Sequence, residues 1–142
     1  MEIKKILVPV DGSDASKHAL TDAIDMAKAH SAKLVLLAVA DVTEAAYPIM
    51  GVTFDKDGFY NVKKKTEGML EKLKETVPAD IDLDAKVESG IPGTIISNAV
   101  EEEQVDIVVM GNSGKGAVSS FIMGSVSQYV IHHVKCPVLV VK

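Results

Sequence analysis

The chain has 142 residues, a length typical of a single domain, and we expect residues 1–142 to form one domain with one core region. Apolar residues make up 47% of the chain and charged residues 25%, which excludes a disordered or collagen-like protein. Asp and Glu number 20 against 15 Lys and Arg, a formal net charge of -5. Because nucleic acids and anionic membranes attract basic surfaces, we expect neither as a partner.

Cys136 is the single cysteine, so an intramolecular disulfide cannot form and a reducing compartment is favoured. The first residues lead directly into a strand-like segment, without the apolar region and cleavage site of a signal peptide. No apolar run approaches the ~20 residues that a membrane helix needs. These observations predict a cytoplasmic protein.

Five apolar segments alternate with segments of helical periodicity, which is typical of βαβ units and a parallel sheet. The first two, residues 6–10 and 34–39, are continuously apolar, as expected for central strands that are covered on both faces. Residues 81–87 alternate between apolar and polar, so we expect a third strand near an edge of the sheet. A fourth strand is predicted at residues 105–110, and a fifth at residues 137–141.

Four helices are predicted around these strands. Ser13 or Asp14 caps the first, whose small apolar residues allow close packing on the sheet. The second is expected at residues 62–77, the third begins near Pro92, and the last covers residues 124–134. Right-handed crossovers then predict an α/β protein, a three-layer αβα sandwich with an open, five-stranded, mainly parallel sheet.

The connection of residues 41–61 is longer than a simple turn between a strand and a helix. Four of the six aromatic residues lie in it: Tyr47, Phe54, Phe59 and Tyr60. Two interpretations stay open for this segment. It either folds over the sheet edge, with the aromatic rings filling gaps, or forms a lid or a partner surface.

A glycine-rich sequence follows the fourth strand, at the sheet edge where parallel α/β proteins bind ligands. It consists of Gly111-Asn112-Ser113-Gly114, nine further residues, and then Gly124-Ser125-Val126-Ser127 at the start of a helix. Glycine permits a positive φ and a close approach to a ligand, and free N–H groups at a helix start attract anions. The spacing therefore favours an elongated polyphosphate, although a glycine-rich turn after a strand is often only a turn. Neither a Walker loop nor a Gly-x-Gly-x-x-Gly motif is present.

Three separated motifs resemble those of the ATP-binding class of the universal stress protein family (UspA-like), in the family's order and over the whole chain. They are Pro9-Val10-Asp11-Gly12-Ser13, Gly111-x2-Gly114-x9-Gly124-Ser125 and Cys136-Pro137-Val138-Leu139-Val140-Val141. The resemblance implies a Rossmann-like fold of the adenine nucleotide alpha hydrolase-like type. It also implies bound ATP, ADP or AMP, with Mg²⁺ or Mn²⁺ bridging phosphate oxygens rather than held in a protein cage. Asn112 and Lys115 depart from the family, in which Ser or Thr and Arg are common at these positions.

The resemblance assigns residues to the two ends of the nucleotide. The adenine and ribose end is implied for Pro9, Val10, Asp11, Val39, Met110 and Gly111, and the phosphate end for Gly114, Gly124, Ser125, Val126 and Ser127. The Asp11 carboxylate can accept hydrogen bonds from ribose hydroxyls or a base amine, and it can also cap the following helix. Lys115 either pairs with a terminal phosphate or is a solvated loop residue.

Hydrolysis needs a group that orients water against the terminal phosphate, and the sequence offers no clear candidate. We therefore expect a nucleotide-dependent switch of the stress response with at most slow ATP hydrolysis or autophosphorylation. Ser125 and Ser127 are the first phosphoacceptors to test.

The resemblance also implies a homodimer in which the last strands, from Pro137 to Val141, pair antiparallel, which would cover a hydrophobic edge. Two alternatives to a nucleotide switch stay open. One is a nucleotide-free dimeric scaffold that contacts a protein partner through residues 47–60. The other is an ATP-using enzyme, although the Ser-Gly-Gly loop of related ligases is replaced here by Val10-Asp11-Gly12-Ser13.

Overall fold

The computed structural model describes residues 1–45, 56–114 and 123–142, which contain a five-stranded parallel sheet. In chain order the elements are β1 (Lys5–Val10), α1 (Asp14–His30), β2 (Lys33–Asp41), the 3-10 helix η1 (Val42–Ala45), α2 (Lys56–Lys74), β3 (Leu83–Gly90), α3 (Pro92–Glu102), β4 (Ile107–Gly111), α4 (Ser125–His133) and β5 (Val138–Val141). The strands pair in the order β3-β2-β1-β4-β5, and every pair is parallel. The predicted fold class is confirmed, as are the central positions of β1 and β2 and the edge position of β3.

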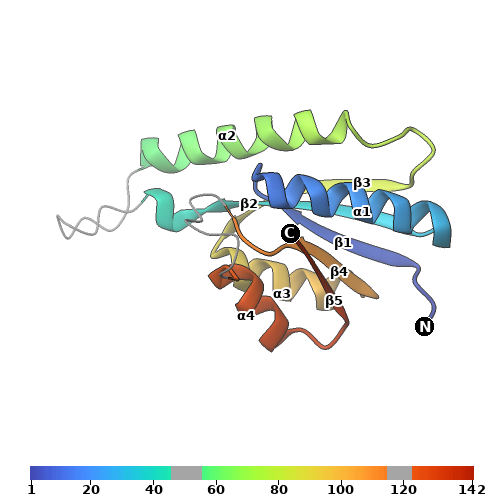
Figure 1. Ribbon diagram of the computed structural model, residues 1–142. Helices are drawn as coiled ribbons and strands as arrows, with labels where there is room; N and C mark the ends of the chain where they lie inside the picture. Colours follow the sequence, from blue (N-terminus) through green and yellow to red (C-terminus); the bar gives the residue numbers. More distant parts are fainter. Residues whose placement is uncertain (46–55, 115–122) are drawn as a thin grey trace.

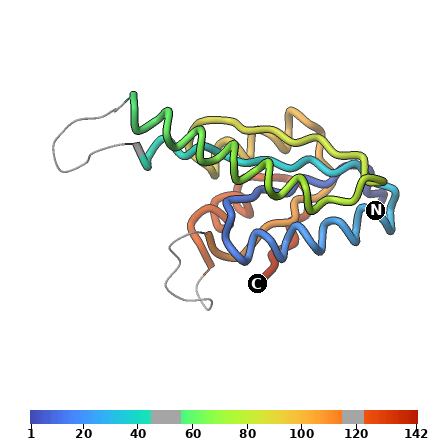
Figure 2. Tube along the Cα trace, turned by 90° about the horizontal axis from the view of Figure 1, so that it is seen from above, coloured from blue at the N-terminus to red at the C-terminus, as the bar shows by residue number. Residues whose placement is uncertain are grey.

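Helices cover both faces of the sheet, with α1 and α2 on one face and α3 and α4 on the other (Figure 1). Viewed from above, α1 and α2 lie side by side (Figure 2). Successive residues of β1 point to opposite faces, so Ile6 and Val8 pack beneath α1 and α2 while Leu7 packs beneath α3 and α4. The continuously apolar sequence of the central strands thus fills two hydrophobic layers at once.

The start of α2 differs from the prediction. The helix begins at Lys56 rather than at residue 62, and it ends at Lys74 rather than at residue 77. Its first residues combine polar side chains, a glycine and two adjacent aromatic rings, without apolar residues at the helical period, so the sequence pattern missed them. Phe59 and Tyr60 therefore belong to α2 and not to a connecting loop, whereas residues 46–55 lie outside the described part of the chain.

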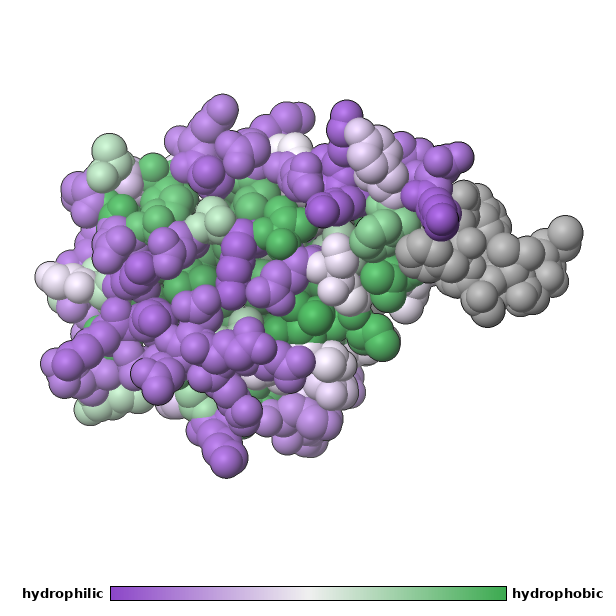
Figure 3. Space-filling view, turned by 180° about the vertical axis from the view of Figure 1, so that it is seen from behind, coloured by the Kyte–Doolittle hydropathy of each residue, from purple (hydrophilic) through white to green (hydrophobic). Residues whose placement is uncertain are grey.

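Polar side chains cover most of the back of the molecule, and apolar side chains show in the hollows between them (Figure 3). No helix in the described ranges combines the length and the apolar character that a membrane span requires. The largest apolar residues of the sheet lie inside the two core layers instead.

Gly68 lies in the exposed middle of α2, where an added Cβ would meet no atom within 4 Å. Alanine favours the helix and reduces the conformational freedom of the unfolded chain. We expect Gly68→Ala to raise the free energy of unfolding by about 0.5–1 kcal/mol, measured by chemical denaturation.

Gly93→Ala is the matched control, because its Cβ would lie 2.7 Å from Cδ1 of Tyr129, between α3 and α4. That variant should be less stable than the parent protein. A stabilising effect of Gly93→Ala would contradict the close packing of these two helices.

Candidate functional site

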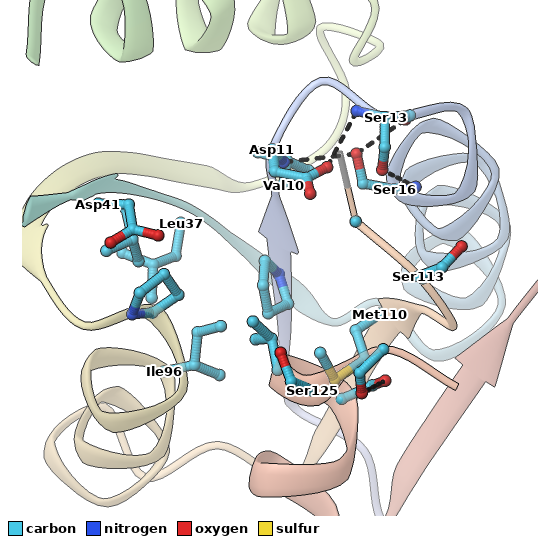
Figure 4. Close-up of a pocket in the computed structure, with 18 of the residues that line it drawn as sticks. Val10, Asp11, Ser13, Ser16, Leu37, Asp41, Ile96, Met110, Ser113 and Ser125 are labelled. Atoms are coloured by element: carbon cyan, nitrogen blue, oxygen red, sulfur yellow. Dashed lines mark hydrogen bonds between the residues drawn. The ribbon is translucent and has the colours of Figure 1, made fainter. Parts of the chain in front are cut away.

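A cavity of about 430 Å³ opens at the carboxyl ends of the strands (Figure 4). Its centre lies at the ends of β1 and β4, where the strand order reverses, because β2 lies on one side of β1 and β4 on the other. Open parallel sheets bind ligands at this position. The starts of α1, α3 and α4 complete the walls, together with η1 and the middle of α2.

All predicted site residues that the structure describes line this cavity. They are Pro9, Val10, Asp11, Val39, Met110, Gly111, Gly114, Gly124, Ser125, Val126 and Ser127. Lys115 lies outside the described residues. The fold therefore gathers residues from four separate segments of the chain into one hollow.

The cavity has an apolar end and a polar end. Leu37 and Val39 of β2 and Ile96 of α3 form the apolar end. The polar end consists of the turn after β1, the segment after β4 and the start of α4. Figure 4 shows Leu37, Asp41 and Ile96 on one side, with Asp11, Ser13 and Ser113 across from them. Such a hollow suits an elongated ligand with a flat apolar part and an anionic part.

The N-termini of α1 and α4 are capped differently. At α1, the Ser13 hydroxyl oxygen is the cap and accepts a hydrogen bond from the Ser16 amide at 3.2 Å. At α4 the N-cap is Gly124, and no side chain caps the helix. The first intrahelical bond of α4 runs from the Gln128 amide to the Gly124 carbonyl at 3.1 Å. The amides of the three preceding residues therefore supply the positive end of the helix at the wall of the cavity.

Asn112 ties the two ends of the glycine-rich loop together. Its main-chain carbonyl accepts hydrogen bonds from the Gly124 amide at 2.7 Å and from the Ser127 hydroxyl at 3.2 Å. Its own amide donates to the Val141 carbonyl at 2.7 Å. The Gly124 amide is thus used to close the loop, and Gly124 contributes the shape of the cavity rather than a free N–H group.

Ser125 and Ser127 offer different chemistry. The Ser127 side chain is 2% exposed, and its hydroxyl also lies 2.9 Å from the Gly124 carbonyl, as a donor. Ser125 is exposed. Of the two expected phosphoacceptors, Ser125 is therefore the accessible hydroxyl, while Ser127 faces the cavity through its main chain.

The glycines of this loop are required for space and not for a positive φ. In the described ranges the glycines with positive φ are Gly12 (83°) and Gly90 (155°), so Gly111 and Gly114 do not use the positive φ that glycine permits. A Cβ on Gly111 would lie 2.8 Å from the main-chain carbon of Ala15 at the start of α1. A Cβ on Gly114 would lie 2.6 Å from Oδ2 of Asp11.

Asp11 supports the turn from β1 into α1. Its Oδ1 accepts a hydrogen bond from the Ser13 amide at 2.9 Å, while Oδ2 faces Gly114. The cap of α1 is therefore Ser13, and Asp11 holds that cap in place. One carboxylate thus joins the turn after β1 to the segment after β4.

The cavity is acidic. Asp11, Asp41 and Glu44 line it, and none of the lining residues in the described part of the chain is basic. In the same part of the chain, no group of three or more His, Cys, Asp or Glu residues is placed to hold a metal ion. Main-chain amides are therefore the positive groups that the described walls offer to an anion.

Several residues of the cavity were not assigned to the nucleotide from the sequence. They are Ser13, Ser16, Leu37, Asp41, Glu44, Thr66, Met69, Pro92, Ile96 and Ser113. The period of two along β2 could have found Leu37 and Asp41, because they share a strand face with Val39. No local pattern could have found Thr66 and Met69, because only the packing of α2 brings them there.

The histidines and the cysteine lie elsewhere. His133 is exposed and stacks on Tyr129 with ring centroids 3.7 Å apart, and His18 lies with Nδ1 3.0 Å from the Lys142 carbonyl. Partial burial raises the pKa of the Cys136 thiol, which favours a small core-packing residue over a reactive thiolate.

Comparison with known proteins finds related sequences and similar folds. Residues 2–142 match the model of the Universal stress protein family. Universal stress protein MJ0531 of Methanocaldococcus jannaschii is 32% identical over 98% of this chain and 82% of its own.

Two solved structures cover 100% of this chain with similar folds. Hypothetical protein MJ0577 has a TM-score of 0.87 and 28% identity over 97% of its own chain. A universal stress protein in complex with cAMP has a TM-score of 0.74 and 25% identity over 99% of its own chain.

Gly111→Ala tests the packing of β4 against α1. Since the new Cβ would meet main-chain atoms that cannot rotate away, we expect the free energy of unfolding to fall by about 1–3 kcal/mol in chemical denaturation. Gly68→Ala, the exposed helical variant, serves as the control. Unchanged stability of Gly111→Ala would show that the two elements are less tightly packed than described.

Proposed function

Because the chain belongs to the universal stress protein family, we propose that its cavity binds an adenine nucleotide and that the protein acts as a nucleotide-dependent switch in the stress response. The uncapped start of α4 beside the glycine-rich loop, at one end of a cavity whose other end is apolar, is the observation that carries this proposal. The cAMP complex of a structural relative supports an adenine nucleotide as the ligand.

The apolar end suits the adenine ring. The last registered pair between β1 and β2 is Val10 with Ala38, whereas β2 continues to Asp41. The main-chain edge of β2 from Val39 onward therefore extends beyond β1. A flat heterocycle can pair with this edge as an added strand would, with one face toward Leu37 and Ile96. Asp11, directly after β1, can accept a hydrogen bond from a ribose hydroxyl.

The polar end suits the phosphates. The main-chain amides of Ser125, Val126 and Ser127 begin a helix whose positive end attracts anions. Because the described walls are acidic, a polyphosphate also needs a counter-charge. Mg²⁺ or Mn²⁺ held through the phosphate oxygens and water would supply it, as Mg²⁺ commonly does with nucleotides.

The proposal also includes an expectation that any ATP hydrolysis in the cavity is slow. Hydrolysis requires a base or a residue that orients water at the terminal phosphate. Asp11, directly after β1, accepts a hydrogen bond from the Ser13 amide and is assigned to the ribose. Asp41 follows the apolar residues of β2 and its carboxylate is held by Thr43, away from Ser125 at the start of α4 (Figure 4). At most slow ATP hydrolysis, or autophosphorylation on the exposed Ser125, fits this arrangement.

A calorimetric titration with ATP and Mg²⁺ or Mn²⁺ tests the proposal. We expect saturable binding by the parent protein and a loss of affinity of at least about tenfold in Gly114→Val, because the new side chain would displace the Asp11 carboxylate and fill the cavity. Gly68→Ala, on the exposed face of α2, should bind ATP as the parent does.

Equal affinity of the parent and Gly114→Val, or no binding by either, would contradict a nucleotide site and favour the scaffold alternative. Rapid release of ADP during the titration would favour an ATP-using enzyme.

The same proposal includes a homodimer formed through β5. This strand is an edge of the described sheet, and its Leu139 is 39% exposed. The carbonyls of Pro137 and Val141 accept hydrogen bonds from residues at either end of β4, so the main-chain groups of Val138 and Val140 face the open side. Antiparallel pairing of two copies would satisfy these groups and cover the apolar edge.

Val140→Pro removes one outward N–H group of β5. We expect a dimer for the parent protein and a monomer for Val140→Pro in sedimentation equilibrium, with Val140→Thr dimeric as the control. A monomeric parent protein would contradict the β5 interface.

A further inference from the structure

Asp41 is the acidic residue on the strand face that forms the apolar end of the cavity. Side chains of a strand alternate between faces, so Leu37, Val39 and Asp41 share one face of β2. Leu37 and Val39 pack in the core beneath α3, which also contains Ile96. Figure 4 shows the Asp41 carboxylate on the side of Leu37 and Ile96. The floor of the apolar end is thus two aliphatic residues followed by one carboxylate.

The orientation of this carboxylate is fixed by Thr43. Oδ1 of Asp41 accepts hydrogen bonds from the Thr43 amide at 2.9 Å and from the Thr43 hydroxyl at 2.6 Å. Both bonds use the same oxygen, and no donor in the described ranges is bonded to Oδ2. The cavity therefore has a held carboxylate with one further oxygen available as an acceptor.

We propose that Asp41 determines the base specificity of the cavity by accepting a hydrogen bond from the exocyclic amine of a 6-aminopurine. This inference rests on the proposed function, because it requires a purine nucleotide with its base at the apolar end. The 6-amino group of adenine is a donor and matches Oδ2. The 6-oxo group of hypoxanthine is an acceptor. With this base, the 6-oxo oxygen and Oδ2 of Asp41 would face each other without a hydrogen atom to share.

The aliphatic surroundings strengthen this discrimination. Leu37 is 0% exposed and Ile96 is 3% exposed, so a base that packs on them loses the water on that face, while Asp41 itself is half-buried. A mismatch between polar groups costs more where water cannot replace the missing hydrogen bond. Shape alone would not distinguish the two bases, because adenine and hypoxanthine are nearly the same size.

The test compares ATP with ITP, which carry the same ribose and triphosphate, by calorimetric titration in the presence of Mg²⁺. For the parent protein we expect ATP to bind about tenfold or more tightly than ITP. Asp41→Asn keeps a carbonyl oxygen for Thr43 and replaces Oδ2 by an NH₂ donor. This variant should bind ATP more weakly than the parent does and ITP more tightly.

Glu101→Gln is the matched control, because it removes the same unit of negative charge at an exposed position of α3 outside the cavity. It should keep the parent's ratio of ATP to ITP affinity. A general loss of structure in Asp41→Asn would lower the affinity for ATP and for ITP together. A direct contact predicts that the ATP affinity falls and the ITP affinity rises.

The outcomes separate this inference from the proposed function. Equal affinity of the parent protein for ATP and ITP, or an equal loss of affinity for both in Asp41→Asn, would overturn the role of Asp41. Neither result would contradict nucleotide binding itself. Absence of ATP binding by the parent protein would overturn both.

Discussion

The hydrogen bond from the Gly124 amide to the Asn112 carbonyl, at 2.7 Å, is the constraint on which the cavity depends. It brings the end of β4 to the start of α4, so that an uncapped helix faces the point where the strand order reverses. Asn112 also donates its amide N–H to the Val141 carbonyl at the end of β5. Asn112 thus joins β4, the start of α4 and the edge strand β5.

The two ends of the cavity arise from different features of the sheet. The apolar end exists because β2 extends past β1 and carries aliphatic side chains on the face beneath α3. The polar end exists because glycines allow β4 and the following segment to approach α1 and Asp11. An acidic lining makes main-chain amides the positive groups of the described walls, which explains why a divalent cation belongs to the proposal.

Prediction from the sequence succeeded where a residue's role depends on its neighbours in the chain. Continuous apolar strands identified the buried centre of the sheet, and the motif around Gly124 identified the helix start. It failed at the first turns of α2, where polar residues form a helix without a periodic pattern. It also could not show that Gly111 is needed for its close contact with Ala15, a residue far away in the sequence.

The sequence by itself determined the parallel α/β architecture, the family and the set of residues gathered at the carboxyl ends of the strands. Hydrophobic periodicity and short motifs are local properties, so they can be recognised without coordinates. Only the tertiary structure decided which amides are already bonded, which glycines are needed for space, and that Thr66, Met69 and Ile96 enclose the cavity. These are contacts between distant segments, and they exist only once the layers have packed against each other.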